Sequence, residues 1–132
     1  LEDASLYTAE EIILLNGSRG ELIFVESSTS IAQAVLTMRD KNISQLPVME
    51  GDKVVGSVNE GLLMNALVDD PSHRDLPIKD VMNDPFPAVL GSTRMDVLSK
   101  MIGKENPALL VKMDDGHFEI LTKQDLITAL AN

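Results

Sequence analysis

Few residues in this sequence have the type and spacing that chemistry requires. Its 132 residues include no Cys and only two His, His73 and His117, which stand too far apart in the chain to suggest a metal site. The sequence therefore offers no thiolate, disulfide or His-based hydrolytic triad, and we assign no catalytic and no metal-binding residue. The acidic stretch Asp114–Gly116 has the composition of a turn and lacks the spacing of a calcium loop. The most informative pair is Thr122 with Asp125, a hydroxyl and a carboxylate three positions apart ahead of an apolar run.

This pair allows two interpretations. Thr-x-x-Asp before an apolar run has the spacing of a helix capping box, in which Asp125 would simply stabilise the start of a helix. An ionised carboxylate also accepts hydrogen bonds from two donors at once, so the same residue could hold a ligand. The short string alone favours the cap, and the choice depends on the elements around it.

The net charge of −10, from 11 basic and 21 acidic residues, argues against anionic partners. An acidic protein repels phosphate backbones and anionic headgroups, so we expect no nucleic acid and no membrane among its partners. No apolar run reaches the length of a membrane-spanning helix, which is about 18 residues. Residues 1–11 are acidic, unlike the basic start of a targeting sequence. We expect a cytoplasmic domain and, because the chain starts with Leu1 instead of Met, one excised from a longer protein.

The sequence repeats itself. A shift of 63 residues, the separation between Met38 and Met101, aligns 23–67 with 86–130 without a gap. The matches include Leu46 with Leu109 and Leu63 with Leu126, at positions where each copy would need its core. The same register held over this length, with the same order of elements, indicates a duplication.

Each copy is predicted to contain a strand, a helix, two further short strands and a second helix. Capping residues, helical periodicity and β-rich runs on either side of a turn define them. Another helix is expected from the capping-box spacing of Thr8 and Glu11. The expected helices are 30–41, 60–68, 93–103 and 123–131, and the expected strands are 45–49, 53–58, 108–112 and 117–121.

These elements predict an α/β (α+β) fold of two tandem repeats, each a small sheet with helices. We expect an N-terminal helix and linker at 1–21, a first repeat at 22–75 and a second repeat at 76–132. Because each small sheet has an apolar face that it cannot bury alone, the repeats are expected to pack sheet to sheet about a pseudo-twofold axis. That packing would create two related clefts at the turns from the last strand into the last helix.

The residues resemble the cystathionine-β-synthase-domain (CBS) pair, or Bateman module. The resemblance rests on Gln45–Val48 and Gly56–Asn59 in the first copy, and on Ala108–Val111 and Ile120–Thr122 in the second. Among such pairs the chain looks most like the C-terminal regulatory region of cystathionine β-synthase. That resemblance implies a pyridoxal-phosphate (PLP) enzyme as parent, with its catalytic domain elsewhere in the same chain, and a homodimer.

The resemblance also implies an adenosyl ligand: S-adenosylmethionine, AMP or ATP. Asp125 would accept hydrogen bonds from the ribose hydroxyls, Thr122 would contact the phosphate or its substitute, and the adenine slot would use Leu46, Pro47, Ala88 and Ile120. For Leu46 and Ile120, plain core burial is an equal alternative. A weaker second cleft would involve Asn59, Leu62, Val25 and Leu109, because Leu62 replaces the carboxylate and cannot accept a hydrogen bond.

The sequence thus predicts a ligand-sensing regulatory module without chemistry of its own. The alternative is an assembly domain whose clefts are vestigial and which only sets the oligomeric state. The missing carboxylate of the first copy keeps that alternative open.

Overall fold

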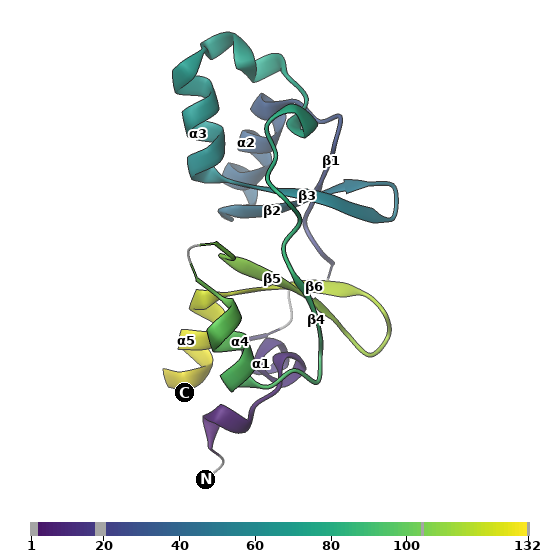
Figure 1. Ribbon diagram of the computed structural model, residues 1–132, viewed down its shortest axis with the longest axis vertical. Coiled ribbons are helices and arrows are strands. Elements are labelled where there is room, and N and C mark those ends of the chain that lie inside the picture. The colour runs from purple at the N-terminus through teal and green to yellow at the C-terminus, as the bar shows by residue number, and fades with distance from the viewer. Residues whose placement is uncertain (1–2, 18–20, 104, 132) are drawn as a thin grey trace. The chain divides into compact units, whose positions relative to one another are not determined.

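The computed structural model describes residues 3–17, 21–103 and 105–131 and forms two compact units (Figure 1). The repeat-1 unit is Ile23–Pro85, and the repeat-2 unit is Phe86–Asn132 together with Leu1–Leu22. Each contains one three-stranded sheet, a fold of mixed α+β class as expected. None of the helices in the described part of the chain is long and apolar enough to cross a membrane.

The repeat-1 unit has one parallel and one antiparallel strand pair. In its sheet β2 pairs with β1 in parallel and with β3 in antiparallel fashion, and Gly51, with a φ of +60°, forms the β2–β3 turn. Helix α2 begins after Ser30, whose hydroxyl accepts the Gln33 N–H as the sequence predicted. The elements are β1 (Val25–Glu26), α2 (Ile31–Lys41), β2 (Gln45–Glu50), β3 (Lys53–Asn59) and α3 (Glu60–Asp69), followed by 3-10 turns at Pro71–Asp75 and Ile78–Asp80.

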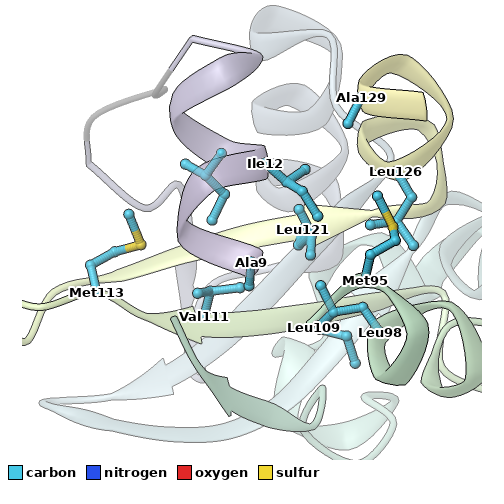
Figure 2. Close-up of a cluster of buried hydrophobic side chains, with 11 residues drawn as sticks. Ala9, Ile12, Met95, Leu98, Leu109, Val111, Met113, Leu121, Leu126 and Ala129 are labelled. Carbon is cyan, nitrogen blue, oxygen red and sulfur yellow. The ribbon is translucent and has the colours of Figure 1, made fainter. Parts of the chain in front are cut away.

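The repeat-2 unit has the same element order. Its sheet pairs β5 with β4 in parallel and with β6 in antiparallel fashion. Helix α1 is capped by Thr8 and Glu11 in the predicted capping box. The elements are a 3-10 turn at Ala4–Leu6, α1 (Ala9–Leu15), β4 (Ala88–Leu90), α4 (Met95–Met101), β5 (Ala108–Lys112), β6 (Phe118–Thr122) and α5 (Lys123–Ala131). Figure 2 shows its core, in which side chains of α1 meet those of the sheet, α4 and α5.

The two repeats match at 63 residues only in their second halves. The pairing of Gln45 with Asn59 recurs as Ala108 with Thr122, as the sequence predicted. The first strand and helix instead match at 64 residues, the separation between Ile31 and Met95, which both begin their helices and lie buried. The gapless alignment is therefore wrong over these elements. One residue is missing from the second repeat between its first helix and its second strand.

Each unit is completed by a segment that precedes the other repeat in the chain. In the repeat-1 unit, Ile78 N–H donates to Thr29 O at 2.7 Å, and in the repeat-2 unit Ala9 N–H donates to Thr93 O at 2.7 Å. Ile78 is fully buried in the repeat-1 core, and Ala9 is fully buried in the repeat-2 core.

The expected boundaries at 21/22 and 75/76 thus differ from the division of the structure. Residues 76–85 complete repeat 1, and the expected N-terminal linker is part of the repeat-2 unit. The physical reason is that these short segments find their backbone partners and their apolar contacts away from the repeat that follows them in the chain.

Candidate functional site

Thr122 and Asp125 lie at the junction of β6 and α5. The Thr122 N–H donates to Asp125 Oδ2 at 2.8 Å, and the Thr122 hydroxyl donates to the same oxygen at 3.1 Å. The pair therefore makes the backbone contact of a helix cap. A carboxylate offers about four lone-pair positions, so capping and ligand binding by Asp125 are compatible.

A row of apolar residues crosses the sheet beside this junction. Backbone pairing places Ala88 next to Leu110 and Leu110 next to Ile120. Ala88 is exposed and Ile120 is half-buried. Because side chains alternate along a strand, Thr122 follows Ile120 on this same face. The structure thus brings together four of the predicted ligand residues (Ala88, Ile120, Thr122 and Asp125) in the repeat-2 unit.

Three predicted contacts belong to the hydrophobic cores. Leu46 and Leu109 have no exposed surface, and Val25 is also buried. Leu46 and Val25 lie in the repeat-1 core, and Leu109 lies in the repeat-2 core. Of the two interpretations given for Leu46, its side chain therefore has the core role, and the side chains of Val25 and Leu109 are likewise occupied in packing.

The repeat-1 unit has different chemistry at the equivalent junction. Asn59 caps α3 by accepting the Leu62 N–H at 2.9 Å, and Leu62 packs against the core. Pro47 pairs with Ser57, at the positions that Leu110 and Ile120 hold in repeat 2. The 64-residue match of the first strands makes Phe24, and not Val25, the counterpart of Ala88. Phe24 is exposed, so an aromatic ring stands where repeat 2 has a methyl group.

The sequence did not single out Asn16, which contacts the candidate site. Asn16 ends helix α1, and its side-chain Nδ2 donates to the main-chain oxygen of Asp125 at 2.8 Å. The only local signal is the presence of Asn at the end of the helix, because Asn is a common capping residue at helix C-termini. The partner is 109 positions away in the sequence, so no local pattern could have identified it.

Carboxylates surround His117 near the β5–β6 turn. Its Nε2 lies 3.0 Å from Glu119 Oε2, and its Nδ1 contacts Asp115. Hydrogen bonds to Glu119 and then to Asp115 raise the pKa of His117 above its ordinary value of 6.5. Glu119 is only 5% exposed. On α1, burial and then the nearby Asp114 raise the pKa of Glu10. In the described part of the chain, no group of three or more acidic or His side chains is placed to hold a metal ion.

We expect stability to fall as the pH rises through the raised pKa of His117. The folded state binds this proton more tightly than the unfolded chain, so the stabilisation is complete below about pH 6.5 and disappears above the folded-state pKa. Urea denaturation between pH 5.5 and 8.5 measures the effect. The raised pKa of Glu10 likewise makes stability fall as the pH rises, but in a lower pH range. Asp115, whose pKa is lowered by hydrogen bonds from His117, loses its stabilisation only in acid. His117→Gln should flatten the profile, and an unchanged profile would contradict the assignment.

Comparison with known proteins agrees with the fold described above. The family model "CBS domain" matches residues 10–69. No curated protein sequence gives a significant match. CBSX2 from Arabidopsis thaliana, solved in complex with AMP, is 22% identical, with a TM-score of 0.76 and coverage of 95% of this chain and 96% of that one.

Two further solved structures have the same fold. A CBS-domain-containing protein from Agrobacterium tumefaciens is 18% identical, with a TM-score of 0.80, and covers 92% of this chain and 98% of its own. The CBS domain structure NE2398 is 20% identical, with a TM-score of 0.84, and covers 96% and 99%. The family model and these structures together support a tandem arrangement, and the chain has the fold of a pair of CBS domains.

Proposed function

We propose that this chain is a regulatory module that binds an adenosyl ligand at Thr122 and Asp125. The supporting observation is the Asp125 carboxylate, held by Thr122 at the β6–α5 junction, at the end of the strand whose Ile120 lies in one row across the sheet with the exposed Ala88. A carboxylate suits the two adjacent hydroxyls of a ribose, because charge-assisted hydrogen bonds are the stronger kind. The AMP complex of CBSX2, a protein of the same fold, lends further support.

The charge balance favours a ligand with few negative charges. A triphosphate usually requires two or three converging Lys or Arg side chains. Lys123 adjoins Thr122, but Lys112 pairs with Phe118 at the opposite end of β6, and the chain as a whole carries a net charge of −10. AMP and S-adenosylmethionine are therefore the preferred candidates, ahead of ATP.

The equivalent junction of repeat 1 is proposed to bind weakly or not at all. Leu62 cannot accept a hydrogen bond, and each buried ribose hydroxyl left without a partner would cost about 1–3 kcal/mol. The Asn59 side-chain oxygen is already engaged in capping α3. If Asp125 is the ribose acceptor, the repeat-2 junction fills first.

Regulation would follow from linkage. A ligand that binds one arrangement of a protein more tightly shifts the population toward that arrangement, and the coupling is reciprocal. The regulated partner would be a catalytic domain of the same chain in the cytoplasm. The resemblance to the regulatory region of cystathionine β-synthase makes a PLP-dependent lyase the proposed parent, with PLP confined to that catalytic domain.

A second copy of this chain is the other proposed partner. Helices α2 and α3 line a groove of about 590 Å³, and on α3 Met64 and Val68 are 60% and 75% exposed. On α5, Ile127 repeats the exposure of Met64 at the equivalent position, and Leu130 one turn later is exposed as well. Apolar helix faces of this kind suit a symmetric dimer. They also favour the alternative function, an assembly domain that binds no ligand.

Thermal melting with AMP, S-adenosylmethionine and ATP tests the binding function. A ligand that binds only the folded state, at 100 times its dissociation constant, stabilises it by about 2.7 kcal/mol. We expect a shift with AMP or S-adenosylmethionine and a smaller one with ATP at equal concentration. Absence of a shift with all three would support the assembly function, which light scattering of the unliganded chain would then test.

A further inference from the structure

Helix α1 packs directly on the helix that begins at the proposed ligand site. Ala9 and Ile12 of α1 share a core with Leu126 and Ala129 of α5, as Figure 2 shows. Backbone hydrogen bonds also hold the start of α1, with Ala9 donating to Thr93 O. Although α1 lies far from α5 in the sequence, it is part of the structural surroundings of Asp125.

Asn16 makes a specific polar link between these two helices. Its backbone N–H closes α1 by donating to Ile12 O at 3.0 Å, and its side-chain Nδ2 donates to Asp125 O at 2.8 Å. The other side-chain atom, Oδ1, is buried and has no hydrogen-bond partner among the residues that the structure describes. The bond to Asp125 therefore orients the Asn16 side chain.

Asp125 is consequently held from two sides. Its carboxylate accepts both Thr122 donors, and its main-chain oxygen accepts Asn16. A ligand that bonds to the carboxylate restrains the first turn of α5, and the Asn16 acceptor lies in that same turn. Conversely, a docked α1 holds Asp125 in a fixed orientation before the ligand arrives, which reduces the ordering cost of binding.

We propose that Asn16 is a positioning residue for Asp125 and that α1 is the element that responds to ligand. The inference rests on the proposed function, because it assumes that an adenosyl compound binds Asp125. Ligand binding stabilises the docked α1, and the docked α1 raises the ligand affinity by the same factor, because coupling between two equilibria is reciprocal. The α1 helix then transmits the state of the site to residues 3–8, which lead into it.

Hydrogen exchange with AMP as the probe tests this coupling. In the unmodified chain, AMP should slow exchange of the α1 backbone amides at residues 12–16. In Asn16→Ala this protection should disappear, and the AMP affinity should fall about 3- to 10-fold, the equivalent of one ordinary hydrogen bond. Asn65→Ala, at an exposed position of α3, is the matched control and should behave like the unmodified chain.

The outcomes separate the two proposals. If the unmodified chain binds neither AMP nor S-adenosylmethionine, the proposed function fails, and the coupling fails with it. If AMP binds but α1 exchange is unchanged, only the coupling is overturned, and this result requires no variant to fold. Full protection and affinity in Asn16→Ala, or in Asn16→Asp, which keeps the shape but removes the donor, would equally overturn the role of Asn16.

Discussion

Ile12→Ala is expected to lower the free energy of unfolding by about 2–5 kcal/mol, although Ile12 lies in an N-terminal helix of seven residues. The Ile12 side chain has no exposed surface and packs in the repeat-2 core. Truncation removes buried methyl groups and leaves a cavity that the surrounding side chains fill only in part. Urea denaturation measures the loss. Hydrogen exchange should place it in 95–129, the far end of the chain, and not in the adjacent repeat 1.

Ile78→Ala provides the reciprocal test. Ile78 precedes repeat 2 in the chain but is buried in the repeat-1 core, so its truncation should loosen 25–66 and leave α5 protected.

Leu14→Ala is the control for Ile12→Ala, because Leu14 is in the same helix as Ile12 but is 59% exposed. It should change stability by no more than about 0.5 kcal/mol. Equal losses for Leu14→Ala and Ile12→Ala, or loosening of the adjacent repeat, would contradict the assignment of the two segments.

Local signals were enough to predict the α-helices and the strands β2, β3, β5 and β6, whereas the short strands β1 and β4 were not located. The side chains of Thr8 and Ser30 make the predicted caps, and the predicted bounds of β5 and α5 agree with those of the structure. Helix α4 is shorter than the predicted 93–103, because Arg94 is extended at its start and Ile102 is extended at its end. Periodicity shows which face of a helix is apolar, but not which core covers that face. Sequence reasoning therefore could not assign α1 to the repeat-2 unit or residues 76–85 to the repeat-1 unit.

The missed residue between the repeats has a similar cause. Met38 and Met101 match at a shift of 63, which concealed the 64-residue match of the buried Ile31 with Met95. The error carried over to the candidate site, because it assigned Val25 in place of Phe24 as the counterpart of Ala88. The Thr122–Asp125 pair was accessible from sequence because both residues lie in one short segment. The Asn16–Asp125 contact was not, since it depends on the packing of α1 against α5.

Asp125→Ala is expected to weaken AMP or S-adenosylmethionine binding by at least about 100-fold. The variant removes the acceptor proposed for both ribose hydroxyls, and hydrogen bonds to charged groups contribute about 1.5–3 kcal/mol each, so the loss of two corresponds to a factor of about 100 or more. The structural cost is smaller. The variant also loses the two bonds from Thr122, and a lost helix cap costs about 1 kcal/mol. Isothermal titration measures the affinity, and urea denaturation measures the fold.

Asp96→Ala separates a ligand contact from a general effect of charge or capping. Asp96 also lies in the first turn of a helix of the repeat-2 unit, where its carboxylate accepts the Val97 N–H. Removing it changes the net charge by the same amount, so a loss of affinity caused by net charge alone should appear in both variants. We expect Asp96→Ala to bind ligand normally. Unchanged affinity in Asp125→Ala, or equal losses in both variants, would mean that Asp125 serves as a helix cap alone and that the ribose acceptor lies elsewhere.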